Sequence, residues 1–141
     1  MPRKPAARND VSTPRANNGE TAYQTLQART ELVLSLFLAE DWEGVRRFDE
    51  QNLGLYAEKL RPGHPLPSYM KIELARAYAG LGRADEAVEL GLEGWRVVKE
   101  VKGLPVENRI DALTWLVAVH VAAGREGEAA EFRSELETLR R

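Results

Sequence analysis

The most constraining feature of this chain is a pattern that recurs every 42 residues. Four apolar series keep this spacing: Leu32, Leu74 and Leu116; Val45, Ala87 and Ala129; Phe48, Leu90 and Phe132; Leu55, Val97 and Leu139. Gly82 and Gly124 occupy the matching turn position, where the first unit has Glu40. A period between about 20 and 50 residues is typical of stacked repeat proteins. Because one such unit cannot bury its own apolar face, the pattern predicts an array of similar units.

The composition indicates a soluble globular chain that forms one domain. The chain has 141 residues, of which 43% are hydrophobic and 30% charged. No apolar run reaches the roughly 18 residues that span a bilayer, and no apolar stretch follows the basic amino terminus as in a secretory signal. The absence of cysteine excludes disulfides and thiolate metal sites. We therefore expect a cytoplasmic protein that does not enter the membrane.

Charge and proline content separate a short amino-terminal arm from the rest of the chain. The net charge is −2, but the first 20 residues are net positive and the remainder is net acidic. Residues 1–19 contain three prolines, three asparagines and almost no side chain that could pack in a core. Such a composition does not offset its ordering entropy. We predict a disordered basic arm over 1–19 and a helical repeat domain over 20–141.

Helical spacing of apolar residues runs through the whole predicted domain. It predicts helices over about 20–39, from Trp42 to about 61, over about 68–81 and from about 126 to 140. A further helix holds Asp85 and Glu86 in its first turn and reaches about 102, and another extends from the break at Pro105 to about 123. Asp41 is placed to cap the helix that begins at Trp42. The three prolines in 61–67 predict that this segment is not helical.

Short turns inside each pair of helices force the two helices to run antiparallel. The predicted repeats are about 20–61, 66–103 and 105–141. Each hairpin leaves an apolar stripe that its neighbour has to cover. The predicted fold class is therefore all-α, an α-α superhelix of three stacked antiparallel hairpins.

The segment Leu74–Ala87 resembles the helix-turn-helix core of the tetratricopeptide repeat. It has a leucine, the small Ala75, Tyr78, the turn glycine Gly82 and a small alanine in that order. The 42-residue period is similar to the kinesin-light-chain type of this repeat, and the loop residues Pro62, His64 and Pro65 match its proline-rich loop. The resemblance covers about residues 24–140. The family's early tryptophan and its second-helix aromatic are replaced here, the latter by Asp49, Gly91 and Arg133.

The resemblance implies a binding surface on the concave face, which the first helix of each hairpin lines. Carried over to this sequence, the strongest candidates for partner contact are Leu34, Phe37, Tyr69, Ile72, Arg76, Thr114, Trp115 and Ala118. The same face includes Gln27, Thr30, Leu38 and Val121. Aromatic and arginine side chains commonly anchor interfaces, and an apolar groove suits an amphipathic helix or an extended peptide. The alternative is that the array buries these residues as ordinary core.

Other residues that could carry chemistry have simpler interpretations. Trp95 and His120 lie on apolar stretches and are expected in the core, and His64 is expected to be structural. No histidine pair has metal-ligand spacing, and no phosphate loop or nucleophile motif occurs. We therefore expect no metal, no cofactor and no enzymatic activity.

Three hypotheses for function remain open at this point. The first is a cytoplasmic adaptor or scaffold that binds a peptide or helix of a partner protein in the concave groove. The second is a structural or regulatory subunit that self-associates, for example as a homodimer, or docks permanently in a larger complex. The third, least favoured, is a nucleic-acid-associated factor acting through the basic arm, where four cations within residues 3–15 would give only weak, salt-sensitive attraction.

Overall fold

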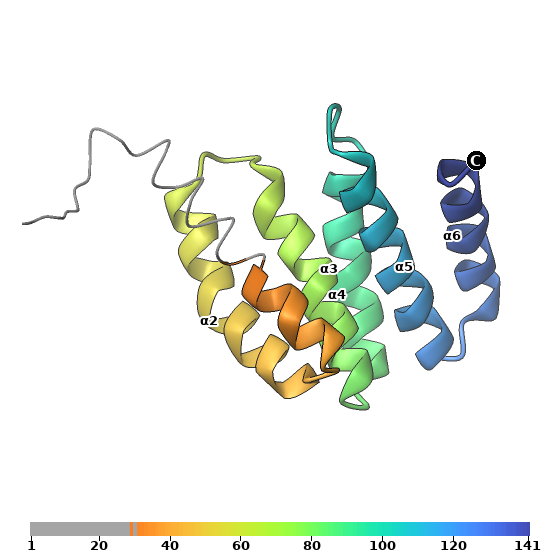
Figure 1. The fold of residues 1–141 in the computed structure, drawn as a ribbon, viewed down its shortest axis with the longest axis horizontal. Helices are drawn as coiled ribbons and strands as arrows, with labels where there is room; N and C mark the ends of the chain where they lie inside the picture. Colours follow the sequence, from red (N-terminus) through yellow and green to blue (C-terminus); the bar gives the residue numbers. More distant parts are fainter. Residues whose placement is uncertain (1–28, 30) are drawn as a thin grey trace, which may run out of the picture. The chain divides into compact units, whose positions relative to one another are not determined.

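The computed structural model describes residue 29 and residues 31–141, and all regular structure within them is α-helical (Figure 1). Five helices are labelled: α2 (Trp42–Lys59), α3 (Pro65–Gly80), α4 (Ala84–Val98), α5 (Val106–Ala122) and α6 (Glu126–Leu139). A further helical segment covers 31–38. The prediction of an all-α fold is confirmed. The arm predicted over 1–19 lies outside the described residues, as does most of the predicted helix before residue 31.

The described residues up to Ala39 belong to one compact unit, and Glu40–Arg141 form a second. In the first unit, the Ala39 amide donates to the Ser35 carbonyl at 3.1 Å. Among the described residues of this unit, Val33 is buried, with 2% of its surface exposed, whereas Leu32 is 46% exposed. Leu32 therefore has the same place in the 42-residue period as the buried Leu74 and Leu116, but its side chain is exposed.

In the second unit, α3 and α5 each pack against three other helices. Helix α3 packs against α2, α4 and α5, while α4 also packs against α5 and α5 against α6. The pairs α3–α4 and α5–α6 are joined by short turns and run antiparallel (Figure 1). Contacts of α5 with both helices of the preceding pair show that one hairpin stacks on the other. Over these residues the predicted stacking of helical hairpins is confirmed.

The 42-residue period of the sequence reappears in the backbone. Helices begin at three residues spaced by 42: Trp42, Ala84 and Glu126. The residue two positions before each start has a positive φ, namely 53° at Glu40, 84° at Gly82 and 75° at Gly124. The two later turns close with the same 2.8 Å bond, from the Arg83 amide to Tyr78 and from the Arg125 amide to His120. A repeated turn is therefore the local structure behind the repeated sequence.

The core of the second unit follows the same period. The small residues Val45, Ala87 and Ala129 have no exposed surface, which allows each second helix to approach its neighbours closely. The largest cluster of buried side chains comprises Ile72, Trp95, Val98, Ala112, Leu113, Leu116, Phe132 and Leu136. His120 is also fully buried, and its Nδ1 donates to the Leu116 carbonyl at 2.8 Å. The expected core positions of Trp95 and His120 are confirmed.

The starts of α2 and α3 depend on two capping side chains. The Asp41 carboxylate accepts a hydrogen bond from the Gly44 amide at 2.9 Å, as predicted for this cap. His64 caps α3 in the same way, since its Nδ1 accepts from the Leu66 amide at 3.1 Å. Burial, with a smaller contribution from Arg61, lowers the pKa of His64 and so favours the neutral ring that this bond requires.

Two predicted helix boundaries are wrong. The segment 61–67 was expected to be non-helical throughout, but α3 begins at Pro65. Proline is tolerated there because amides of the first helical turn have no intrahelical partner. The helix expected to reach about 102 ends at Val98. Beyond it, the Arg109 guanidinium from α5 donates to the carbonyls of Lys99 and Val101 at 3.3 and 2.9 Å, which stabilises a turn in place of another helical turn.

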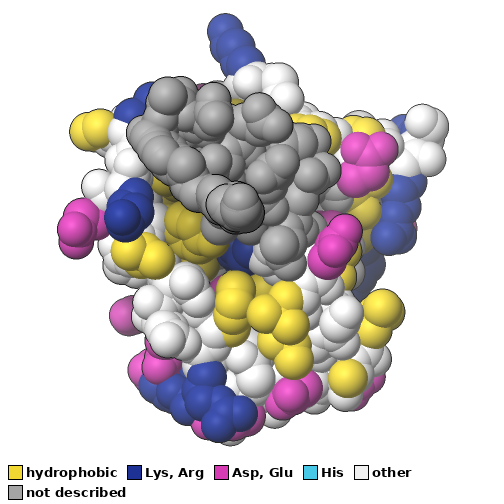
Figure 2. All heavy atoms as spheres, turned by 60° about the vertical axis from the view of Figure 1, so that its left-hand side comes forward, with side chains coloured by type: hydrophobic (Ala, Val, Ile, Leu, Met, Phe, Trp, Pro, Cys, Tyr) yellow, Lys and Arg dark blue, Asp and Glu magenta, His cyan; other side chains and the backbone are white. Residues whose placement is uncertain are grey.

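Not all apolar side chains of the described residues are buried. Figure 2 shows hydrophobic side chains gathered between basic and acidic ones on one face of the molecule. In the second unit, the large exposed hydrophobic residues are Leu55, Leu81, Val97, Val106 and Val121. Among the described residues, none of the helices combines the length and apolarity needed to cross a membrane.

The packing of α3 against α4 requires a glycine at position 94. A β-carbon there would lie 2.4 Å from the Ser68 carbonyl oxygen and 3.0 Å from the Ile72 side chain. The Ser68 oxygen belongs to the backbone of α3, so it cannot move aside as the end of a flexible side chain could. The separation of these two helices is therefore set by the missing side chain.

We predict that Gly94→Ala destabilises the protein by about 1–3 kcal/mol, because it forces the two helices apart. The matched control is Gly54→Ala within α2, where a β-carbon would meet nothing within 4 Å. There alanine should stabilise by up to about 1 kcal/mol through its higher helix propensity. Urea unfolding followed by circular dichroism measures both changes. Equal effects of the two substitutions would show that close packing at Gly94 is unimportant.

The turn before α2 contains strain that the two later turns avoid. Glu40 is the one non-glycine residue with a positive φ among the described residues. We predict that Glu40→Gly stabilises the protein by about 0.5–1 kcal/mol, since glycine adopts this conformation without a steric penalty. Glu40→Ala removes the same charge but keeps a β-carbon, so it should give no stabilisation. Thermal unfolding of both variants separates backbone strain from charge.

Candidate functional site

The predicted contact residues fall into different environments. Leu34 and Phe37 belong to the helical segment 31–38, where Leu34 is 45% exposed and Phe37 is half-buried. The other six lie in the second unit on α3 and α5: Tyr69, Ile72, Arg76, Thr114, Trp115 and Ala118. We refer to the side of α3 and α5 that carries these six residues as the α3–α5 face.

The α3–α5 face is centred on an aromatic pair. The rings of Tyr69 on α3 and Trp115 on α5 lie 5.5 Å apart with an interplanar angle of 63°, an edge-to-face arrangement. Both side chains are half-buried, as is Ala118, and Thr114 beside Trp115 is exposed. The pair therefore offers a partly exposed aromatic surface with a polar residue at its border.

One predicted member of this face is not accessible. Ile72 has no exposed surface and belongs to the main core cluster. It lies under the packing of α3 with its neighbours, so it cannot contact a partner in this structure. For this residue the alternative interpretation as ordinary core is correct. The residue 42 positions later, Thr114, is exposed.

Arg76, the predicted cation of the face, is engaged within the chain. Its guanidinium lies 4.2 Å from the centroid of the Trp42 ring at the start of α2. Burial lowers the pKa of Arg76, while the nearby charge of Glu40 acts in the opposite direction. Arg76 therefore joins α3 to α2, and any ligand anion has to compete with this stacking.

Sequence reasoning missed Asp111, which lies on the same side of α5 as Thr114 and Trp115. Its carboxyl is partly buried, and burial together with the neighbouring Glu107 raises the pKa of Asp111. Because a poorly hydrated carboxylate has much to gain from a hydrogen-bond donor, Asp111 adds a polar contact point to the α3–α5 face. Its only sequence signal was its position 42 residues after Tyr69.

Sequence reasoning also missed a groove on the opposite side of α3. We call it the α2–α4 groove; it has a volume of about 550 Å³ and is lined by Glu50, Leu53, Gly54, Leu74, Tyr78, Glu86, Glu89, Leu90 and Glu93. Leu74 and Tyr78 lie on nearly the same side of α3 because they are four residues apart, whereas Tyr69 and Arg76 point roughly the other way. The two surfaces are therefore distinct.

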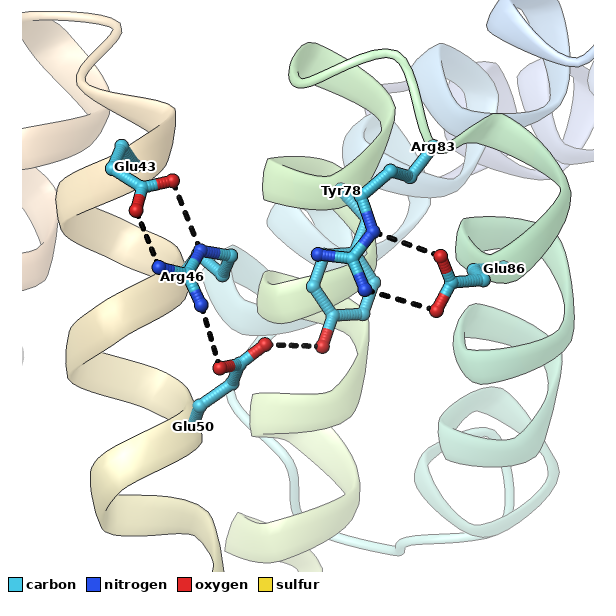
Figure 3. A network of polar contacts seen from close by, with 6 residues as sticks. All are labelled: Glu43, Arg46, Glu50, Tyr78, Arg83 and Glu86. Carbon is cyan, nitrogen blue, oxygen red and sulfur yellow. Dashed lines mark hydrogen bonds and ion pairs between the residues drawn. The ribbon is translucent and has the colours of Figure 1, made fainter.

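A network of polar contacts joins the three helices at this groove (Figure 3). The Tyr78 hydroxyl of α3 donates to Glu50 of α2 at 2.6 Å, and Glu50 also accepts from Arg46 at 2.8 Å. Arg83 lies 4.2 Å from the centroid of the Tyr78 ring and pairs with Glu86 of α4 through two hydrogen bonds of 2.8 and 3.0 Å. The Tyr78–Glu50 bond links α3 to α2, and the stacking of Arg83, the N-cap residue of α4, on Tyr78 links α3 to the start of α4.

Comparisons with known proteins give no match of any of the three kinds. No family model matches the chain, and neither a curated protein nor a solved structure does. Among the described residues, no group of three or more histidine, cysteine or carboxylate side chains is arranged to hold a metal ion. Function therefore has to be inferred from the two surfaces themselves.

The Tyr78–Glu50 bond predicts a pH dependence at the alkaline end. Burial and the Glu50 carboxylate raise the pKa of Tyr78 from 10.0 to about 12. Because the folded-state value is the higher one, this contribution to stability is complete below about pH 10 and is lost as the pH rises toward 12. We expect the free energy of unfolding of Tyr78→Phe, measured by urea unfolding, to fall less steeply with pH over this interval.

A spectroscopic titration provides the control for this prediction. Tyrosinate absorbance should show a component that ionises near pH 12, and this component should be missing from Tyr78→Phe. Glu50→Gln should move it to lower pH, because the neutral amide no longer opposes a second negative charge. If the late component persists in Tyr78→Phe, it belongs to another tyrosine.

Proposed function

We propose that this chain is a tetratricopeptide-like helical-repeat adaptor, which binds a segment of a partner protein and catalyses no reaction. The supporting observation is the α3–α5 face, where Tyr69 and Trp115 form a partly exposed aromatic pair beside the exposed Thr114. Aromatic side chains held rigidly at a surface supply large contact area at small entropic cost. A cytoplasmic location, expected from the sequence, is part of the same proposal.

The order of helix contacts supports the family assignment within this proposal. The segment Leu74–Ala87, which resembles the repeat core, forms the second half of α3, the turn and the first residues of α4. The next hairpin stacks on this one, since α5 contacts both α3 and α4, as expected for an array of stacked repeats. The lack of catalytic motifs in the sequence favours binding over catalysis.

Binding of a different protein is favoured over self-association through α6. In α4, the side that packs on α3 and α5 is formed by Val88, Gly91, Leu92, Trp95 and Val98. The residues 42 positions later are Ala130, Arg133, Ser134 and Glu137 on α6 and Arg140 just after it, and all are exposed. Such a polar side offers little apolar area to a second copy. The third hypothesis, contact with nucleic acid, rests on an arm outside the described residues and gains no support here.

The proposal is tested by locating the partner's contact site. A photo-crosslinking amino acid at the exposed position Thr114 should trap one specific protein in cells, whereas the same group at the exposed position Glu131 on α6 should not. With that partner purified, Thr114→Arg and Trp115→Ala should each weaken binding by about tenfold or more in calorimetric titrations. Unchanged affinity in both variants would exclude the α3–α5 face as the binding surface.

A further inference from the structure

The α2–α4 groove has a counterpart one repeat further along the chain. A shift of 42 residues maps α2 onto α4, the end of α3 onto the end of α5, and α4 onto α6, because the matching helices start or end 42 residues apart. Leu53, Tyr78 and Leu90 of the groove then correspond to Trp95, His120 and Phe132. The two sites are thus equivalent in backbone and different in side chains.

We call the contact of α2, α3 and α4 the first junction and the contact of α4, α5 and α6 the second junction. At the second junction the corresponding space is filled by aromatic rings. Trp95 and Phe132 meet edge to face, with ring centroids 6.1 Å apart, and His120 lies 5.0 Å from Phe132. Trp95, Phe132 and His120 are all buried. At the first junction, leucines replace both large rings, and the volume of about 550 Å³ remains. The groove therefore resembles the aromatic cluster of the second junction, with leucines in place of the rings of Trp95 and Phe132.

From this comparison we propose that the α2–α4 groove binds a cationic segment of a partner protein, which inserts one large aromatic side chain between Leu53 and Leu90. The volume lies in the range of clefts that bind small-molecule ligands, so it is large enough for one aromatic side chain. The second junction shows that helices with this spacing accept an indole edge-on against the side chain at the Leu90 position. This surface is separate from the α3–α5 face, and a partner could occupy either one alone.

The charge of the groove identifies the rest of the occupant. Its lining contains four carboxylates and no basic residue: Glu50, Glu86, Glu89 and Glu93. Glu50 and Glu86 belong to the polar network, and Glu93 pairs with Lys71 at 3.1 Å. No ion pair or hydrogen bond among the described residues involves Glu89. A lysine or arginine beside the aromatic anchor would meet this carboxylate, which no basic side chain of the described residues neutralises.

The aromatic and cationic parts of the occupant have different roles. An exposed ion pair contributes little to affinity because both charges remain hydrated. Burying an aromatic ring between leucines contributes more, because apolar area leaves water on both sides. We therefore expect the anchor to set the affinity and the flanking cations to set the rate of encounter and the choice of partner.

The experiment uses the full chain and three fluorescein-labelled peptides of about twelve residues, a length suited to one groove. The first peptide carries a central tryptophan flanked by lysines. The second has alanine in place of that tryptophan, and the third has glutamates in place of the lysines. Fluorescence anisotropy should show that the first peptide binds about tenfold or more tightly than either of the others.

Two variants then place the peptide in the groove. Leu53→Trp fills the space as Trp95 fills the second junction, and Glu89→Lys reverses the unpaired charge. Leu53→Trp should weaken binding of the tryptophan peptide by about tenfold or more, and Glu89→Lys should weaken it by about two- to fivefold, mainly by slowing association. The matched controls are Leu55→Trp, at an exposed leucine of the same helix that does not line the groove, and Glu131→Lys, at the residue 42 positions after Glu89. Both controls should bind like the unmodified chain.

The outcomes separate this proposal from the function proposed above. Equal binding of the tryptophan and alanine peptides, or equal losses in Glu89→Lys and Glu131→Lys, would overturn it by indicating general charge attraction. Binding that persists in both Leu53→Trp and Glu89→Lys would place the peptide elsewhere. Glu89 is exposed, so its variant remains informative if Leu53→Trp fails to fold as judged by circular dichroism. The Thr114 and Trp115 variants should leave this binding unchanged, because they lie on the other surface.

Discussion

The close packing of α3 is the constraint on which the rest of the second unit depends. This helix contacts α2, α4 and α5, so it takes part in both the hairpin and the stacking of one hairpin on the next. Its distance from α4 is set at Gly94, where the Ser68 carbonyl occupies the place of a side chain. Because α3 also carries residues of both candidate surfaces on different sides, its position determines the geometry of each.

Both surfaces arise from differences between residues that occupy equivalent places in a repeated backbone. Tyr69 and Trp115 meet across α3 and α5, although the repeat gives neither residue an aromatic counterpart, since Asp111 and Glu73 stand 42 positions away. In the same way, leucine at position 53 leaves open a space that Trp95 closes at the next junction. The repeated parts hold the fold together, and the departures from the repeat create surfaces that can distinguish partners.

Much of the fold could be predicted because its signals are local. The cap at Asp41 and the turn at Gly82 depend on a few neighbouring residues, and their roles follow from the chemistry of one side chain or of its absence. The errors concern helix boundaries, and one of them has a tertiary cause. The helix ending at Val98 stops early because Arg109 of α5 binds the carbonyls beyond it. The helix at Pro65 starts early because its first turn needs no amide donor.

The candidate site was less predictable, since accessibility depends on how helices meet. Helical spacing placed Ile72 and Thr114 at equivalent positions, yet packing buries the first and leaves the second exposed. The sequence alone determined the helices, their turns and their period, because these depend on backbone conformation and on apolar residues at fixed spacing. Only the tertiary structure decided that Arg76 stacks on Trp42 and that a groove opens between α2 and α4. The reason is that both depend on the volumes of side chains far apart in sequence.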